Sequence, residues 1–224
     1  MVEMAKNNKQ IVAVVAAMPD GTGLGTFKEL YPQRLFDVGI AEQHAVTLSA
    51  GLAVGGMKPY VALYSTFLQR AYDQVIHDIC LQKLPVTICI DRAGLVGDDG
   101  ETHQGILDLS FLTPVPNLTI MAPKSMEELR QMLYFSETFD GPLAIRYPRG
   151  GDEKGVVLTP LKSFQSGKFE VLKEGVDGYI YATGKMVARA MVLADKMEEK
   201  GVRYGVVNGV FIKPVDHELI RSHL

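Results

Sequence analysis

Residues 60–90, YVALYSTFLQRAYDQVIHDICLQKLPVTICI, decide the fold class of this chain. Tyr60–Tyr64 and Val86–Ile90 are short runs rich in apolar and β-branched residues, a pattern typical of buried strands. Between them, the apolar residues of Phe67–Leu81 recur at helical spacing, so this segment predicts an amphipathic helix. A strand, a helix and a second strand in this order form a βαβ unit, whose two strands lie parallel.

The same alternation continues on both sides of this unit. Further strands are predicted at Ile11–Ala16, Leu118–Met121 and Leu143–Arg146. Further helices are predicted at Ala41–Met57 and from Ser125 to about Phe139, where Ser125-Met-Glu-Glu128 fits a capping box. Alternating strands and helices indicate an α/β fold of three layers, with a mostly parallel sheet and helices on both faces.

The length of 224 residues corresponds to more than one domain of about 150 residues. Residues 1–150 hold the strand–helix series, and we expect them to form the first domain. Residues 151–177 are rich in Gly, Lys and Ser, which predicts a linker with a hairpin. Residues 178–224 begin a second, partial α/β domain, with strands at Gly178–Ala182 and Tyr204–Val207 around a helix at Met186–Lys200. The chain ends in a helix-like stretch, Pro214–Leu224.

The composition is that of an ordinary globular protein, with 47% hydrophobic and 22% charged residues. Its net charge of −3 gives no basic excess for nucleic acid or an anionic membrane. No apolar run is long enough to cross a bilayer. Cys80 and Cys89 lie in apolar surroundings and are expected to be reduced, buried thiols of a cytoplasmic protein.

The segment 91–105, DRAGLVGDDGETHQG, concentrates charged side chains and four glycines after a predicted strand. Its glycines suggest a backbone that approaches a ligand closely. Arg92 and His103 could meet an anionic substrate, with Asp99 orienting or polarising the imidazole. Asp98, Asp99, Glu101 and His103 are also potential metal ligands, but their spacing is not that of a calcium loop, and we expect no metal on these residues.

Three other features each allow two interpretations, and a fourth, at 20–25, favours one. Glu42, at the start of a helix, is either a capping carboxylate or one that exchanges a proton with a bound base. Tyr64 and Phe67 either pack in the core or stack on a ring. Arg146 and Arg149 are either solvated or bind phosphate. The segment 20–25, DGTGLG, has the spacing GxGxG and is not followed by an evident helix, so it predicts a plain turn.

Several separated segments together resemble one family. They are MPDGTGL at 18–24, DVGIAEQHAV at 37–46, YSTFLQRAYDQVIHD at 64–78, DRAGLVGDDGETHQG at 91–105 and IRYPRG at 145–150. In this order they resemble the pyrimidine-binding domain of the 1-deoxy-D-xylulose-5-phosphate synthases, thiamine-diphosphate enzymes of the transketolase superfamily. Residues 178–224 resemble the start of that family's C-terminal domain.

The resemblance implies roles for individual residues. Glu42 matches the catalytic glutamate that hydrogen-bonds N1′ of the cofactor's aminopyrimidine. Phe67 matches the aromatic residue that stacks on this ring, and Arg70 matches a residue that lines the same pocket. Five residues match positions around the acceptor, glyceraldehyde 3-phosphate: Tyr64, Arg92, Asp99, His103 and Arg149. Arg92 and Arg149 would hold its phosphate, and His103 would assist proton transfer at its carbonyl group.

The family condenses pyruvate with glyceraldehyde 3-phosphate and releases CO2, on a route that leads to isoprenoids and thiamine. Its enzymes hold the cofactor's diphosphate and Mg²⁺ on an N-terminal domain, for which this sequence has no Gly-Asp-Gly and Asn pattern. We therefore expect a homodimeric enzyme of which this chain is a part that is inactive alone. Two alternatives remain open. One is a subunit of a split transketolase or of a 2-oxoacid dehydrogenase, although the amino-acid sequence of 91–105 argues against the dehydrogenase. The other is a non-catalytic interaction module.

Overall fold

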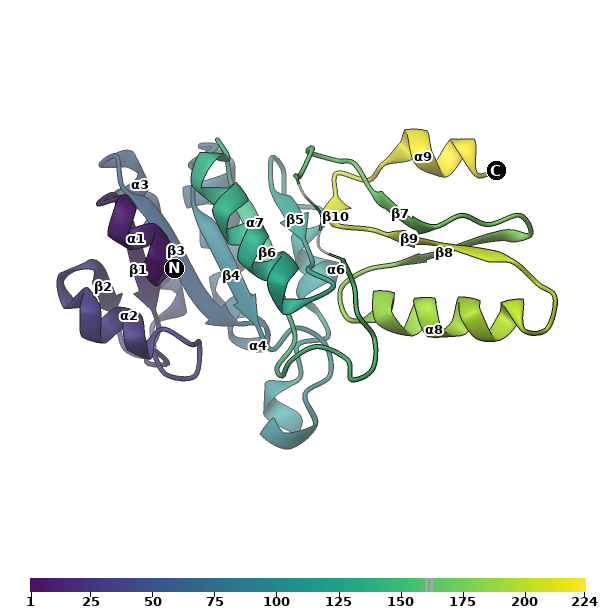
Figure 1. The fold of residues 1–224 in the computed structure, drawn as a ribbon. Coiled ribbons are helices and arrows are strands. Elements are labelled where there is room, and N and C mark those ends of the chain that lie inside the picture. Colours follow the sequence, from purple (N-terminus) through teal and green to yellow (C-terminus); the bar gives the residue numbers. More distant parts are fainter. Residues whose placement is uncertain (160, 162) are drawn as a thin grey trace. The chain divides into compact units, whose positions relative to one another are not determined.

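A computed structural model describes residues 1–159, 161 and 163–224. The chain forms two compact units. The first comprises Met1–Thr119 and Leu133–Arg149, and the second comprises Ile120–Met132 and Gly150–Leu224. The elements of both units are labelled in Figure 1, and each unit is described by itself. No helix among the described residues is long and apolar enough to span a membrane.

The first unit, all of whose residues are described, is built on a parallel sheet. Its strands are β1 (Ile11–Val15), β2 (Leu35–Asp37), β3 (Lys58–Tyr64), β4 (Thr87–Asp91) and β6 (Leu143–Arg146). They lie in the order β6-β4-β3-β1-β2, and each adjacent pair is parallel. Its helices are α1 (Val2–Asn7), α2 (Gly25–Leu30), α3 (Glu42–Val54), α4 (Ser65–Leu68), α5 (Tyr72–Gln74) and α6 (Asp108–Leu112).

Helices cover both faces of this sheet. Alternate side chains of β1, including Ile11 and Val15, pack with Met4 of α1 and Phe27 of α2 in one apolar cluster. The helix α3 lies against β1 and β3 on the other face, behind the sheet in the view of Figure 1. The predicted α/β fold, with a mostly parallel sheet between helices, is confirmed.

The helix predicted at Phe67–Leu81 has a different form in the structure. The winding begins at Ser65 and changes type repeatedly, from α4 through a 3-10 turn at Gln69–Ala71 and the short α5 to a π-turn at Val75–Cys80. Changes from α to 3-10 and π winding are frequent at functional sites, because they redirect side chains that a regular helix would place elsewhere.

Four short helices and strands of the first unit are absent from the prediction. They are α1, α2, β2 and α6, of six, six, three and five residues. The helix α2 begins at Gly25, the last residue of DGTGLG, so the expectation that no helix follows this turn is wrong. Segments this short contain too few residues for a periodic apolar pattern.

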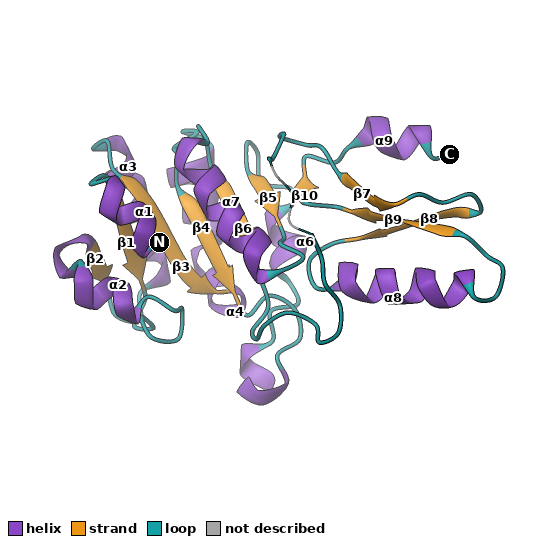
Figure 2. Cartoon of the chain, in the orientation of Figure 1, coloured by secondary structure: helices purple, strands orange, loops and turns teal. Residues whose placement is uncertain are grey.

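The second unit contains a smaller sheet with helices on both faces. Its elements are β7 (Glu170–Lys173), β8 (Gly178–Ala182), α8 (Met186–Glu198), β9 (Tyr204–Asn208), β10 (Phe211–Lys213) and α9 (His217–Ser222). In the order β7-β9-β8, β8 is parallel and β7 antiparallel to β9. Figure 2 shows α8 and α9 on opposite sides of these strands. Ile180 and Val206 face Ala190 and Ala194 of α8, whereas Tyr179 and Tyr181 contact His223, just after α9.

Two predictions for this unit need correction. The described part of 151–177 contains no hairpin, because its strand β7 pairs with the distant β9; residues 160 and 162 lie outside the described residues. The terminal helix α9 spans only His217–Ser222. Asp216 is its N-cap, and the Oδ1 atom of Asp216 accepts a hydrogen bond from the Leu219 backbone N–H at 3.1 Å.

A charged cluster is buried inside the second unit. The Lys124 ammonium donates to Glu128 Oε1 at 3.0 Å and to Glu170 Oε2 at 2.5 Å. The Asn208 amide donates to the same two oxygens. Lys124 lies in the segment between β5 (Thr119–Met121) and α7 (Met126–Thr138), and Glu128 belongs to α7. The side chains of Lys124 and Glu128 are fully buried, at 0% exposure. Buried charges of this kind depend on their partners.

Candidate functional site

The candidate residues of the first unit gather at one edge of its parallel sheet. Tyr64 ends β3, Arg92 follows the last residue of β4, and Arg149 follows β6 by three residues. The strands β6, β4 and β3 are neighbours and parallel, so their carboxyl ends lie side by side. Open α/β sheets bind ligands at this edge.

Three rings form an aromatic group at this edge. The rings of Tyr64 and Phe67 stack with centroids 5.6 Å apart and an angle of 11° between their planes. The His103 imidazole meets both of them edge-on, with its centroid 6.2 Å from that of Tyr64 and 5.2 Å from that of Phe67. Burial raises the pKa of Tyr64 above its ordinary value of 10.0, so its hydroxyl is neutral at physiological pH.

Glu42 and Arg70 form an ion pair beside this group. Glu42 is the first residue of α3, where the helix dipole favours a carboxylate. Arg70 Nη1 donates to Glu42 Oε1 at 2.5 Å, and its guanidinium carbon lies 4.9 Å from the Phe67 ring centroid. The Glu42 side chain is only 5% exposed, whereas that of Arg70 is 50% exposed. Glu42 Oε2 forms no hydrogen bond within the described residues, so this oxygen can accept one from a ligand.

Arg92 is held by several partners at once. Its Nη1 donates to Asp91 Oδ2 at 2.6 Å and to the Gly21 carbonyl at 2.6 Å. Its Nε lies 3.4 Å from Asp99 Oδ2, and its guanidinium carbon stacks 4.1 Å from the Tyr64 ring centroid. Burial raises the pKa of Asp91, although the positive charge and hydrogen bonds of Arg92 oppose this.

Arg149 meets Arg92 at Asp99. Arg149 Nη1 pairs with Asp99 Oδ1, while Arg92 contacts Oδ2 of the same carboxylate. Arg146 is engaged elsewhere, since it donates to the buried Asp108 from Nε at 2.7 Å and from Nη2 at 3.3 Å. Two guanidinium groups therefore converge on one carboxylate, that of Asp99, which lies between Arg92 and Arg149.

The structure brings the predicted residues into two adjoining groups. One comprises Glu42, Phe67 and Arg70, the other comprises Tyr64, Arg92, Asp99 and Arg149, and His103 contacts a ring of each. Asp99 pairs with the two arginines and not with His103, whose Nδ1 lies 2.9 Å from the Thr102 hydroxyl. The expectation that Asp99 orients the imidazole is therefore wrong, because the arginines offer full positive charges.

Sequence reasoning missed the residues that support these side chains. Asp91 holds Arg92, and two glycines allow close approaches to it and to Tyr64. A Cβ atom at Gly21 would lie 2.3 Å from the Tyr64 hydroxyl, and one at Gly105 would lie 2.1 Å from the Arg92 carbonyl oxygen. The glycines of the two motifs were visible signals of close backbone approach. Nothing in the local sequence distinguished Asp91 from the other acidic residues near it.

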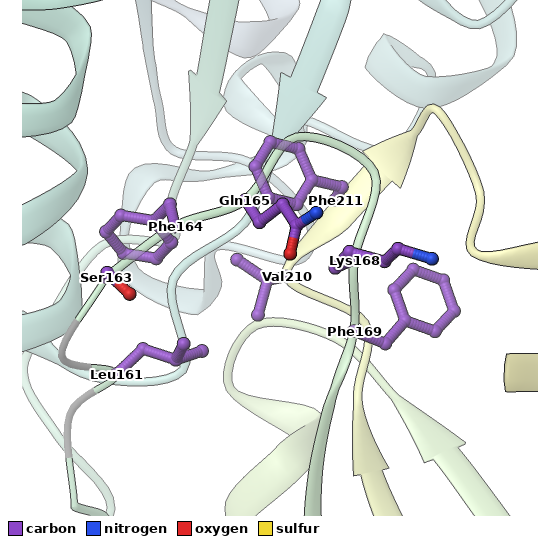
Figure 3. Close-up of a pocket in the computed structure, with 8 residues that line it drawn as sticks. All are labelled: Leu161, Ser163, Phe164, Gln165, Lys168, Phe169, Val210 and Phe211. Carbon is purple, nitrogen blue, oxygen red and sulfur yellow. The ribbon is translucent and has the colours of Figure 1, made fainter.

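The described residues form no metal-binding cluster, and a cavity among them is lined by residues other than the candidate residues. In the part of the chain that the structure describes, no three His, Cys, Asp or Glu side chains are grouped so that they could hold a metal ion. A cavity of about 200 Å³ lies in the second unit, and Figure 3 shows its lining residues, Leu161, Ser163, Phe164, Gln165, Lys168, Phe169, Val210 and Phe211. None of these is a candidate site residue.

Comparisons with known protein families cover most of the chain. A family model described as "Transketolase, pyrimidine binding domain" matches residues 1–151, and one described as "Transketolase, C-terminal domain" matches residues 167–224. The protein named 1-deoxy-D-xylulose-5-phosphate synthase from Clostridium perfringens (strain 13 / Type A) is 60% identical over 223 residues, which are 99% of this chain and 36% of that protein. The protein of the same name from Carboxydothermus hydrogenoformans is 52% identical, with the same coverage. The chain thus spans about a third of the length of these relatives.

Solved structures give the same fold. The structure titled "Split gene transketolase, inactive beta4 tetramer" has a TM-score of 0.88 at 33% identity, covering 99% of this chain and 72% of its own. Transketolase from Campylobacter jejuni has a TM-score of 0.82 at 21% identity, covering 94% of this chain and 34% of its own. This second similarity concerns the fold alone.

Proposed function

The chain belongs to the family of the transketolase pyrimidine-binding domain, and from this premise we propose that it supplies the pyrimidine side of the thiamine-diphosphate site of a 1-deoxy-D-xylulose-5-phosphate synthase. The reaction would condense pyruvate with glyceraldehyde 3-phosphate and release CO2. The relatives that share 60% and 52% of its residues carry this name. The observation that supports the proposal is the convergence of Arg92 and Arg149 on one carboxylate, because two guanidinium groups that gather around one anionic group would also bind the phosphate of a substrate.

The group around Glu42 fits the aminopyrimidine end of the cofactor. Its buried carboxylate has one oxygen that is not engaged by Arg70, and it can accept a hydrogen bond from a protonated ring nitrogen. Phe67 offers an aromatic ring for stacking, and Arg70 fixes the carboxylate from its other side. When bound, thiamine diphosphate supplies the electron sink that decarboxylation of a 2-oxoacid needs. Glu42 would hold and release the proton at the ring nitrogen.

The group around Arg92 fits the acceptor substrate. Arg92 and Arg149 would hold its phosphate through charge-assisted hydrogen bonds, which are the strong type for this anion. The His103 imidazole, which contacts the Tyr64 and Phe67 rings edge-on, would move a proton at the acceptor's carbonyl oxygen. Tyr64 supports the guanidinium of Arg92 with its ring face, and Asp99 fixes the distance between the two arginines.

The proposal includes parts that lie outside these residues. We propose that the cofactor's diphosphate and Mg²⁺ are held by a polypeptide region that this chain does not match, because its curated relatives are almost three times as long. We also propose that the enzyme is a homodimer in the cytoplasm. The two cysteines are buried and are not joined in a disulfide in the structure, which agrees with a reducing compartment.

Reconstitution tests the proposed reaction. The chain is mixed with the separately produced part of the Clostridium perfringens relative that it does not match, together with thiamine diphosphate and Mg²⁺. We expect CO2 release from pyruvate that depends on glyceraldehyde 3-phosphate, with formation of 1-deoxy-D-xylulose 5-phosphate. CO2 release that needs no acceptor would instead indicate a 2-oxoacid dehydrogenase subunit. A complex that assembles but has no activity would contradict the proposal and favour an interaction module.

Glu42→Gln tests the role of the buried carboxylate. The amide cannot exchange the proton at the ring nitrogen, so we expect CO2 release to fall by at least about 100-fold. Glu29→Gln is the matched control, because Glu29 lies exposed on α2 and should leave the rate unchanged. Full activity of Glu42→Gln would show that this assignment is wrong.

A split transketolase is the second candidate, since a structure with that title covers 99% of this chain at 33% identity. The same reconstitution separates the two. A transketolase transfers a two-carbon unit from a ketose phosphate and releases no CO2, so activity with a ketose phosphate but not with pyruvate would favour the second candidate.

A further inference from the structure

Asp91 is a buried carboxylate that serves one neighbour. It is the last residue of β4, is paired in register with Tyr64 of β3, and is 6% exposed. Oδ1 accepts a hydrogen bond from the Arg92 backbone N–H at 2.7 Å, and Oδ2 accepts one from Arg92 Nη1 at 2.6 Å. The same carboxylate therefore holds both the main chain and the head group of the following residue.

The backbone of Arg92 needs such support. Its φ angle is +55°, in the left-handed region that non-glycine residues seldom adopt. The carbonyl of Arg92 also lies so close to Gly105 that a Cβ there would be only 2.1 Å away. Strained conformations persist where surrounding contacts fix them, and they concentrate at functional sites.

These contacts engage the Nε–Nη2 edge of the guanidinium least. Nη1 is occupied by Asp91 and by the Gly21 carbonyl, while the ring of Tyr64 covers one face. Nη2 forms no hydrogen bond within the described residues, and Nε makes only the 3.4 Å contact with Asp99. The Nε and Nη2 hydrogens form the parallel pair of donors that binds two oxygens of one anion.

We propose that Asp91 is a positioning residue, which fixes Arg92 so that its Nε–Nη2 edge faces the substrate's phosphate. This inference rests on the proposed function, because it assumes that Arg92 binds the phosphate. Asp91 itself does not touch the substrate. A guanidinium already held in its binding geometry loses less conformational freedom when the anion arrives, which improves affinity.

The first test uses the full chain and inorganic phosphate. Binding is followed by NMR through the Arg92 Nε–H resonance, for the unchanged chain, for Asp91→Asn and for Asp98→Asn. Asp98 lies exposed on the same loop, so Asp98→Asn removes the same charge without touching Arg92. We expect Asp91→Asn to weaken phosphate binding about tenfold, as for the loss of one charge-assisted hydrogen bond, and Asp98→Asn not to weaken it.

Equal or tighter binding by Asp91→Asn would overturn the positioning role alone. Absence of phosphate binding at Arg92 in the unchanged chain would overturn the phosphate role of Arg92 as well. If Asp91→Asn does not fold, Asp91→Ser replaces it, because its hydroxyl can still accept the Arg92 backbone N–H but cannot reach Nη1 as the carboxylate does.

The second test uses the reconstituted enzyme with glyceraldehyde 3-phosphate and with unphosphorylated glyceraldehyde as acceptors. For Asp91→Asn we expect the KM for glyceraldehyde 3-phosphate to rise about tenfold, with an unchanged KM for pyruvate and for glyceraldehyde. A purely structural defect would affect both acceptors equally, and that outcome would overturn the proposal.

Discussion

Replacing Lys124 with methionine tests the buried charged cluster of the second unit. The change keeps the length of the side chain but removes the ammonium that donates to Glu128 and Glu170. The Glu128 side chain is fully buried, so its carboxylate cannot be hydrated instead. In the unchanged chain, burial raises the pKa of Glu128, while the hydrogen bonds and charge of Lys124 oppose this. Without the ammonium, only the residue 124 backbone N–H and the Asn208 amide still oppose burial, and we expect Glu128 to take up a proton.

The cost of that proton limits the destabilisation. The ordinary pKa of a glutamate carboxyl group is 4.5. Protonating it at pH 7.5, about 3 pH units above that pKa, costs about 1.36 kcal/mol for each pH unit, or about 4 kcal/mol. This agrees with the roughly 3–5 kcal/mol typical for breaking a buried ion pair. At pH 5.5 the difference from that pKa is only about 1 pH unit, so protonation costs about 1.4 kcal/mol. A pKa raised in the folded state means that the variant is most stable below pH 4.5 and loses stability as the pH rises.

Urea denaturation at pH 5.5 and 7.5 measures this difference. Hydrogen exchange at the amides of β9 reports the second unit separately, because the two units need not unfold together. The control is Lys124→Met combined with Glu128→Gln, which removes both charges and should be nearly independent of pH in this range. A loss below about 1 kcal/mol for Lys124→Met, or the same loss at both pH values, would refute the reasoning.

Two further predictions concern single groups. Asp216→Ala removes the cap of α9 and should lower its local stability by about 1 kcal/mol, measured by hydrogen exchange at Leu219 and the following amides. Burial raises the pKa of Asp216, but hydrogen bonds from the backbone N–H groups of Leu219 and Phe169 lower it overall. The stabilisation by this carboxylate is therefore present above pH 3.8 and is lost as the pH falls below that value. Unchanged hydrogen exchange at low pH would contradict this prediction. Burial raises the pKa of the Cys89 thiol to about 12, so it should not react with a thiol reagent at pH 8 until urea unfolds the chain; rapid reaction of the native protein would show that Cys89 is accessible.

The central strands could be predicted because their apolar runs are buried on both faces. Ile11–Val15 and Thr87–Asp91 differ from their predicted bounds by a single residue at one end or both. The helix after Tyr64 lies close to its predicted position but changes between α, 3-10 and π winding. Local periodicity carries no information on such changes of winding.

The candidate site could be predicted as a set of residues, but not as a set of contacts. Resemblance named Arg92 and Asp99, whereas their pairing depends on a loop whose path the sequence pattern leaves open. The hydrogen bond from Arg92 to the Gly21 carbonyl joins residues 71 positions apart. The support from Asp91 depends on a left-handed backbone at Arg92, which is unusual for arginine and has no sequence signal.

The buried cluster around Lys124 also limits where this protein can be divided, by splitting of its gene in evolution or by a cloning boundary in the laboratory. The pyrimidine-domain model ends at residue 151, yet Ile120–Met132 belongs to the second unit. A cut at 151 would separate Lys124 from Glu170, and the Met126 backbone N–H from Asp152, which accepts it at 2.7 Å. The modules that sequence families recognise and the units that fold together therefore have different borders here, and a split that leaves both halves stable must pass elsewhere.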